Sequence, residues 1–469
     1  MNKAIVRQES LTFIRRGPAM FVVALLLLTL FYAGFSGDRW RDTQSQNLES
    51  FQAQAQDALD AFRTQLADIE SGAVEPSPYD ANPMSILFPA TLPPAALADF
   101  AIGHADLHPA SAEISTWRNQ ANVFGRYQFD NPTTLSSSAF DVAMIIVVLL
   151  PLVMIGVSFD VLARDRAQGA LGMILAAPVA LRDLVWTRLW FRNGIIWLTA
   201  AIAMVFLGIV NDDGGDRFNR LGIWLTISLV YLMFWLAMIA YCVARFRSAK
   251  AVMSSLVGAW LLFTLALPAS IATLSEALYP TPSRLAFLSE IRTAQGDTNK
   301  NIAALTDGFM VDHPELTVGD EGLPSFYRAA FLSGEAARVN TKPIIEAYEA
   351  AWSGRDRTVR WAQYLSPAVI AQRLLHLSAG ADLNRQYRFQ AQVQRSLEKL
   401  GDDLGPYIVS RNRLPLAKFD ELAPFEFDDV AASGIALGAI GPVMFLLVLT
   451  ILAGIVADRR LRDETGHLA

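Results

Sequence analysis

The sequence predicts an all-α, polytopic membrane protein: six transmembrane helices with a mostly helical domain outside the bilayer, built from two insertions. Three observations predict this fold class. The chain of 469 residues is 53% hydrophobic and only 18% charged, whereas soluble domains carry about 25% charged residues. Its apolar residues are concentrated in six long runs, and a helix needs about 20 such residues to cross a bilayer. Two long polar segments separate some of these runs, and their apolar residues recur at helical spacing.

The six apolar runs are the predicted membrane spans. The first follows Arg15 and Arg16, as a secretory signal would, but it exceeds the usual core of about 7–15 residues and no small-residue cleavage site follows it. We therefore expect it to remain as a helix. Asp141 is the only acidic residue inside a run, and we expect it to begin a helix at a water-exposed membrane surface rather than relay protons. The runs comprise residues 18–36, 139–159, 193–210, 221–243, 251–274 and 430–456.

Basic residues beside the spans indicate the orientation. Segments on the side of both termini carry more Lys and Arg than Asp and Glu, whereas the segments on the opposite side are acidic. Because basic loops stay in the cytoplasm, we expect both termini to be cytoplasmic. The chain then divides into an elbow helix with span one at 1–36, a first outer insertion at 37–138, spans two to five at 139–274 with a cytoplasmic region at 160–188, a second outer insertion at 275–429, and span six with its tail at 430–469.

Both insertions are too long to be simple connections and are expected to fold. In the first, apolar residues such as Leu48 and Phe51 recur at helical spacing, which predicts that span one continues outward as a rod. This rod should end near Ser71, before the Pro-rich stretch 76–94. The second insertion should contain five helices, at 283–306, 325–340, 343–353, 366–378 and 382–403. Asn340-Thr341-Lys342-Pro343 should separate two of them, and Gly401 and Gly405 should interrupt the last.

The sequence lacks the common signatures of catalysis. No lysine follows a glycine, so the Gly-Lys-Ser/Thr phosphate loop of ATPases is absent, as are the His-Glu-x-x-His and Gly-x-Ser-x-Gly motifs. The single cysteine, Cys242, excludes an intramolecular disulfide. His104 and His108 have a metal-ligand spacing, but Pro109 disfavours the helix that would align them, so we expect a solvated loop. We predict no catalytic, cofactor or metal site in this chain and no nucleic-acid partner.

The cytoplasmic region after span two has the most distinctive pattern in the sequence. Charges alternate at Arg164, Asp165 and Arg166, and Gly169 follows them. A short apolar run then leads to a Pro-Val pair and a basic stretch. This pattern predicts a stiff helical elbow at the inner membrane surface, and the alternative is a solvated loop that is basic only because it faces the cytoplasm.

This region resembles the signature of type-2 ABC exporter permeases, in which an acidic-Arg-acidic-x-Gly-Thr-Leu run follows the second span and precedes a Pro-Val turn and a basic helix. Ala167 stands where this family usually has Glu, and Ala170 where it usually has Thr, which weakens the expected charge pairing but leaves the spacing intact. The residues that the resemblance assigns to ATPase coupling are Arg164, Asp165, Arg166, Gly169, Leu171, Pro178 and Val179.

The two insertions are similar to those of a bacterial subgroup of these permeases that carries two large periplasmic insertions. The likeness in the first insertion lies around 103–109 and Asn131-Pro132. In the second it lies around Ser366-Pro367, 375–380 and Phe389. The order of these motifs relative to the six spans carries the resemblance.

The resemblance implies a permease subunit of an ATP-driven exporter in the bacterial inner membrane. Such a permease binds no nucleotide: two separate ATPase subunits hold ATP and Mg²⁺, and a second permease completes a homodimer or heterodimer. It would make 160–188 the region that docks on the ATPase and 3–16 an amphipathic elbow on the membrane. Because the spans contain so few charged residues, we expect an amphiphilic or peptide-like cargo.

Two other functions are compatible with the sequence. A non-transporting ABC assembly would pass ATP-driven motion through the long outer helix to the periplasmic domain and to a periplasmic or outer-membrane partner. The large exterior mass favours this alternative. An intramembrane enzyme, such as a glycosyl transferase that uses Asp38, would need more spans and clustered acids.

Overall fold

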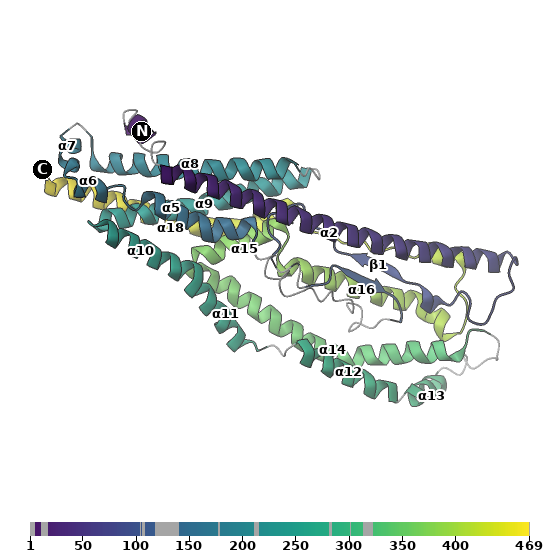
Figure 1. Ribbon diagram of the computed structural model, residues 1–469. Coiled ribbons are helices and arrows are strands. Elements are labelled where there is room, and N and C mark those ends of the chain that lie inside the picture. The colour runs from purple at the N-terminus through teal and green to yellow at the C-terminus, as the bar shows by residue number, and fades with distance from the viewer. Residues whose placement is uncertain are drawn as a thin grey trace.

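The computed structural model shows an elongated molecule with a helical bundle at one end and a mostly helical domain at the other (Figure 1). Both ends of the described chain lie toward the same end of the bundle, away from the other domain, and we call it the terminal end. We call the opposite part the distal domain. The structure describes residues 5–10, 17–103, 105, 108–117, 140–176, 179–210, 215–280, 284–300, 302–312 and 322–468.

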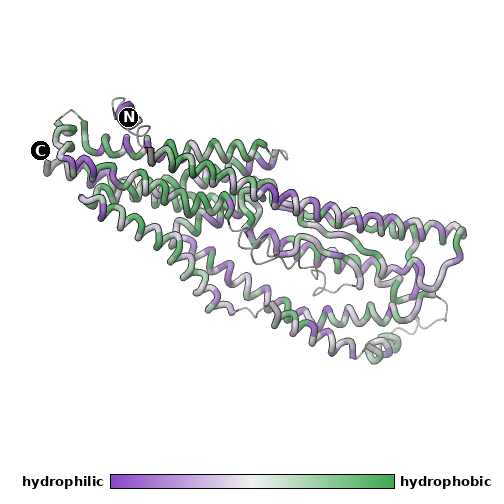
Figure 2. Tube along the Cα trace, in the orientation of Figure 1, coloured by the Kyte–Doolittle hydropathy of each residue, from purple (hydrophilic) through white to green (hydrophobic). Residues whose placement is uncertain are grey.

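Six helices of the described chain are long and apolar enough to cross a membrane, which confirms the predicted number of spans. Hydrophobic residues are concentrated along them in the bundle (Figure 2). The spans are formed by α2 (Gly17–Glu70), by α4, η3 and α5 (Val142–Met144, Ile145–Leu149 and Leu150–Ser158), by α8 (Leu181–Val210), by α9 (Gly215–Arg245), by α10, η4 and α11 (Ala249–Leu261, Leu262–Ala266 and Leu267–Leu278), and by α18 (Ala432–Leu468).

Helix α9 forms the centre of the bundle and packs against α8, α15 and α18. Its large side chains Trp224, Tyr231 and Trp235 are fully buried. The hydroxyl of Tyr231 donates a hydrogen bond to the carbonyl of Val147 at 2.9 Å. Pro151, four residues further along, has no N–H to offer that carbonyl. The π-helical turn η3 and the tyrosine therefore satisfy backbone groups that the proline would leave unpaired in an apolar core.

Helix α2 is a continuous rod of 54 residues, about 80 Å long at 1.5 Å per residue. Its first part is apolar and lies in the bundle, and its second part is largely polar and runs along the distal domain (Figure 2). Near its far end Phe62 packs against Phe419, with ring centroids 5.5 Å apart, and Arg63 Nε lies 2.8 Å from Asp420 Oδ1. The rod predicted from the sequence is confirmed, and it ends at Glu70.

The distal domain is mostly helical, with one two-stranded antiparallel sheet in which Phe88 lies opposite Ile114. Its core includes Phe331, Phe389 and Leu404 from two of its helices. The elements are η1 (Pro83–Ser85), β1 (Phe88–Thr91), β2 (Ser111–Ile114), α12 (Arg284–Lys300), α13 (Ile302–Asp312), α14 (Ser325–Ala362), η6 (Gln363–Leu365), α16 (Leu383–Val409) and α17 (Leu416–Asp420). Helix α15 (Pro367–Ala379), between η6 and α16, lies in the bundle against α9.

Two predicted interruptions in the second insertion are wrong. Helix α14 continues through Pro343, because Ala337 and Ile345 on either side of it are buried, and their packing outweighs a cost of about 3 kcal/mol for an internal proline. Helix α16 continues through both predicted glycine stops. At Gly405 a Cβ atom would lie 3.1 Å from Phe331 Cζ, so this glycine permits close helix packing instead of ending the helix.

Candidate functional site

The region after span two forms a bent pair of short helices at the terminal end of the bundle (Figure 1). Helices α6 (Ala163–Ala167) and α7 (Ala170–Leu175) meet at Gly169, whose φ of 67° lies in the left-handed region. Glycine adopts this conformation without strain, so the sequence sets a sharp bend here. Helix α7 is apolar, yet the side chain of Met173 is 75% exposed. Leu171 of the same helix is buried, so α7 has one side against the bundle and one exposed apolar side chain beside the bend.

A buried cluster of charges holds this bent pair to the bundle. Glu9 bridges two arginines of α8: its Oε1 lies 2.9 Å from Arg188 Nε, and its Oε2 lies 3.1 Å from Arg192 Nε. Arg188 also pairs with Asp165, and Arg192 Nη1 lies 3.1 Å from Asp160 Oδ1. The side chains of Glu9 and both arginines are at most 6% exposed. We call these five residues the Glu9 cluster.

The two arginines also bind the backbone at the end of span two. Arg192 Nη1 donates a hydrogen bond to the carbonyl of Val157, and Arg188 Nη1 donates one to the carbonyl of Val161, both at 2.9 Å. A helix end leaves such carbonyls without partners of their own. The arginines therefore fix the position of α8 relative to the end of span two.

The Glu9 cluster joins segments that lie far apart in the sequence. It connects the helical residues 5–10 with the region 160–165 and with α8. Each side chain in the cluster has an oppositely charged partner. Loss of one member of a buried ion pair typically costs about 3–5 kcal/mol, because the other charge stays buried without compensation. The ion pairs therefore fix the three segments to one another.

Three of the predicted coupling residues are bonded to the bundle or buried in its core. Asp165 pairs with Arg188. Arg166 Nη1 donates a hydrogen bond to the carbonyl of Phe246, just beyond the end of α9, at 3.4 Å. Leu171 is buried, with 8% of its surface exposed, and belongs to the core of the bundle. These contacts favour the structured elbow over the solvated loop.

The other predicted coupling residues lie at or near the surface. Arg164 and Gly169 are exposed. Val179 is half-buried and packs against the core of the bundle. Pro178 lies outside the described residues. Arg164 and the bend at Gly169 therefore lie on the surface at the terminal end, while Val179 packs the connection to α8 against the bundle.

Sequence reasoning missed the partners that hold the elbow. Glu9 is the only acidic residue among the first 37 residues, in a segment otherwise rich in Lys and Arg. Arg188 and Arg192 are four residues apart, which places both on one face of a helix that enters the membrane. A lone acid in a basic amphipathic segment and a paired-arginine face are the signals that could have indicated this contact.

Asp141 begins span two, as predicted, but water does not surround it. Its Oδ1 accepts a hydrogen bond from Met144 N at 2.8 Å, which caps the helix, and its Oδ2 accepts one from Ile102 N at 3.2 Å. The residue is only 4% exposed. The first insertion folds over this end of span two and excludes solvent, which corrects the expected water-exposed position.

A second buried ion pair lies at the opposite end of the bundle, beside the distal domain. Arg217 is fully buried and binds Asp99 through two contacts, at 3.0 Å from Nη1 and 2.7 Å from Nη2. Its Nε also donates a hydrogen bond to the carbonyl of Gly208 at 2.9 Å. Close by, a Cβ atom at Gly37 would lie 1.9 Å from the backbone oxygen of Asp99. The rod, the first insertion and the end of α8 are thus tightly packed here.

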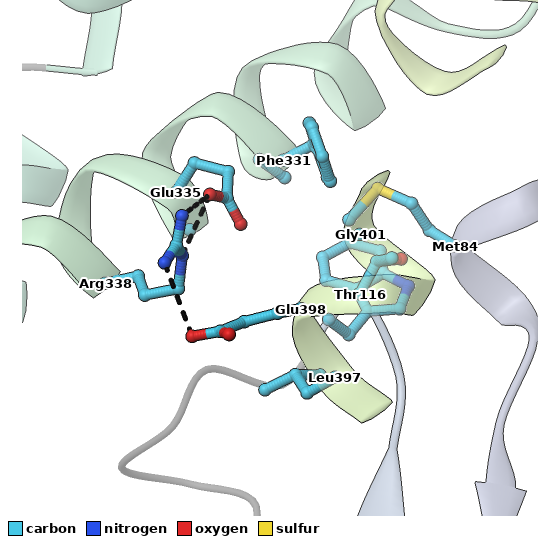
Figure 3. Close-up of a pocket in the computed structure, with 11 residues that line it drawn as sticks. Met84, Thr116, Phe331, Glu335, Arg338, Leu397, Glu398 and Gly401 are labelled. Carbon is cyan, nitrogen blue, oxygen red and sulfur yellow. Dashed lines mark hydrogen bonds and ion pairs between the residues drawn. The ribbon is translucent and has the colours of Figure 1, made fainter. Parts of the chain in front are cut away.

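The distal domain contains a small cavity of about 50 Å³ between α14, α16 and the ends of the strands (Figure 3). Arg338 Nη2 lies 2.8 Å from Glu335 Oε2, and Arg338 Nη1 lies 3.7 Å from Glu398 Oε1. A space of this size holds a few water molecules at most, and its charges are already paired. The cavity is too small for an amphiphilic cargo.

The described residues contain no group of three His, Cys, Asp or Glu side chains that could hold a metal ion. His104, one of the two histidines with a metal-ligand spacing, lies outside the described residues.

These features define a multi-pass, mostly helical membrane protein with a bent pair of short helices at the terminal end of its bundle. Residues 3–323, about two thirds of the chain, match the family described as ABC-2 family transporter protein. The chain belongs to this family and is a membrane component of an ABC transporter. Residues 284–428 match a family described as a domain of unknown function, DUF3526. No curated protein and no solved structure matches the chain.

Proposed function

We propose that this chain is the permease subunit of an ATP-driven exporter in a bacterial inner membrane, with both termini in the cytoplasm and the distal domain in the periplasm. The observation that carries the proposal is the bent pair α6 and α7 at the terminal end of the bundle, with α6 held by the Glu9 cluster through Asp165, in a chain of the ABC-2 family. Two separate ATPase subunits would bind ATP and Mg²⁺. A second permease, identical or paralogous, would complete the transporter.

The region 160–188 would receive the force from the ATPase. Closure of the ATPase subunits around ATP would push the bent helices α6 and α7 against the bundle. Because the Glu9 cluster joins this region to α8 and to residues 5–10, all three would shift together. Span one continues as the single rod α2 into the distal domain, so a tilt of this span would also reach the far end of the molecule.

An amphiphilic or peptide-like cargo fits the composition of the spans. Asp141 is the only acidic residue in the apolar runs, and it is occupied in capping its helix. A path for a small ion or a sugar would be lined by charged or strongly polar side chains.

Transmission of motion without transport is the alternative function, and the continuity of α2 favours it. A rod of about 80 Å that is fastened at its far end to α17 could move the distal domain against a periplasmic or outer-membrane partner. A structure of the complete complex with nucleotide distinguishes the two functions. An apolar cleft that opens to the outer leaflet supports export, and a closed bundle beneath a displaced distal domain supports transmission.

The proposal is tested by copurification and ATP turnover. We expect the chain to copurify with an ATPase and to hydrolyse no ATP by itself. Asp165→Asn should leave membrane insertion intact but uncouple hydrolysis in the complex from function, because it leaves Arg188 with one buried charge partner fewer. Asp463→Asn is the matched control, because this exposed carboxylate lies at the same end of the bundle, in α18 and outside the region 160–188.

ATP turnover by the purified chain alone contradicts the proposal. If the Asp165→Asn complex couples ATP hydrolysis to function as well as the wild type does, the region 160–188 has no coupling role.

A further inference from the structure

Helices α14 and α15 form a hairpin that returns from the distal domain into the bundle (Figure 1). At its turn, the fully buried Ser366 donates a hydrogen bond from Oγ to the carbonyl of Phe263 at 2.5 Å. The neighbouring Tyr364 packs edge-on against Phe445, with ring centroids 4.9 Å apart. Phe263 belongs to span five and Phe445 to span six. The turn of the hairpin is therefore fixed to two membrane spans.

These anchor points lie well inside the predicted bilayer. Phe263 lies about 23 Å along the helix axis from Leu278, the distal end of span five, and Phe445 lies about 20 Å from Ala432, the distal end of span six. The hydrocarbon core of a bilayer is about 30 Å thick. The following helix α15 buries Ile370 in the same core cluster as the central helix α9. The turn therefore lies below the distal surface of the membrane.

Three exposed residues follow one another near the turn of this hairpin, and we call them the stripe. Arg357 and Trp361 lie four residues apart on the same side of α14, and Leu365 follows four residues later in the short helix η6. Trp361 is 75% exposed, Leu365 is 62% exposed, and Arg357 is also exposed. Leu365 lies at the turn, and Arg357 lies about 12 Å further toward the distal domain. The stripe therefore presents a cation, then an indole, then an aliphatic group with increasing depth in the membrane.

This order matches the chemistry of a phospholipid. Arginine side chains near the membrane surface bind phosphate groups, tryptophan is enriched at the interface, and leucine packs among acyl chains. Arg360 beside the stripe is already paired with Asp356, with 3.0 Å between Nη1 and Oδ2. In the part of the chain that the structure describes, Arg357 has no ion-pair partner.

The neighbouring surface also favours a lipid as the occupant. Leu274 and Leu278 of α11, the helix against which α14 packs, are 52% and 57% exposed. The stripe thus continues an apolar surface of span five, which faces the hydrocarbon core in a membrane protein with these six spans.

We propose that this stripe is a phospholipid-binding site in the leaflet on the distal side, with Arg357 at the lipid phosphate and with Trp361 and Leu365 along an acyl chain. The site is independent of the choice between export and transmission. It makes the second insertion a partly membrane-embedded element, where the sequence predicts a wholly exterior one.

The depth of the stripe is measured by spin labels in the full chain in nanodiscs. In a Cys242→Ala background, labels are attached through Leu365→Cys and, as the control, through Val339→Cys, a position in the preceding helix α14 that is 62% exposed in the distal domain. We expect the label at 365 to be relaxed by oxygen and shielded from a water-soluble nickel complex, and the label at 339 to show the reverse. Equal nickel access at both positions overturns the proposal. Shielding of the label at 365 from both reagents also overturns it, because protein would then cover the stripe.

The phosphate contact is measured by native mass spectrometry of the chain released from nanodiscs of phosphatidylethanolamine and phosphatidylglycerol. We expect Arg357→Gln to lower the amount of retained phospholipid at least twofold. Arg395→Gln, which removes the same charge from the exposed face of α16, should leave it unchanged. If both variants retain as much phospholipid as the wild type, Arg357 binds no lipid phosphate and the site is refuted.

Discussion

Replacement of Asp99 by Asn is the sharpest test of how the bundle is joined to the distal domain. The carboxylate binds the fully buried guanidinium of Arg217 through both oxygens, at 3.0 and 2.7 Å. An asparagine has nearly the same shape, but it can accept only one of these two hydrogen bonds and carries no charge. Arg217 keeps its hydrogen bond to the carbonyl of Gly208, so the side chain remains in place with an uncompensated buried charge.

We expect Asp99→Asn to lower the free energy of unfolding by about 3–5 kcal/mol, the typical cost of breaking a buried ion pair from one side. The lost charge-assisted hydrogen bond alone contributes about 1.5–3 kcal/mol of this. The matched control is Asp420→Asn. This carboxylate forms an ion pair of similar length with Arg63, at 2.8 Å, but the two side chains are 43% and 54% exposed. Because solvent screens that pair, we expect no measurable loss of stability.

The assay is unfolding of the full chain in detergent micelles, followed by circular dichroism as a denaturing detergent is added. The variant Arg217→Met/Asp99→Asn should recover much of the loss, because it removes the buried charge together with its partner. The reasoning is refuted if Asp99→Asn and Asp420→Asn unfold at the same denaturant concentration, or if the double variant is less stable than Asp99→Asn.

Three further changes test other contacts. Glu9→Gln should uncouple ATP hydrolysis from function in the complete complex, whereas Glu49→Gln, on the exposed face of the rod, should not; equal activity of the two variants contradicts the coupling role. Gly37→Ala should destabilise the chain in the same unfolding assay, because its Cβ would lie 1.9 Å from a backbone oxygen, whereas Gly222→Ala meets no atom within 4 Å and should not. Burial raises the pKa of Asp382, so its contribution to stability is present in acid and is lost as the pH rises through the folded-state pKa. Asp382→Asn should therefore be more stable than the wild type near neutral pH, and a gain of equal size in acid would contradict this sign.

The sequence by itself determined the features that depend on local composition. A membrane span needs only a run of apolar residues, and all six spans could be identified from such runs. The rod α2 follows from helical periodicity that continues beyond the first span. The bend between α6 and α7 follows from one glycine at the end of a short charged helix, because Gly169 can adopt a positive φ.

Tertiary structure alone decided which of these elements meet. Glu9 and Arg192 are 183 positions apart, and Asp99 and Arg217 are 118 positions apart. Periodicity shows which face of a helix is buried, but it does not show which other helix covers that face. The same limit explains the wrong break at Pro343, where packing on both sides outweighs a local preference. The ion pairs of the Glu9 cluster and the contacts of the α14–α15 turn with spans five and six are set by how whole helices pack, and this is a property of the folded chain that no short segment encodes.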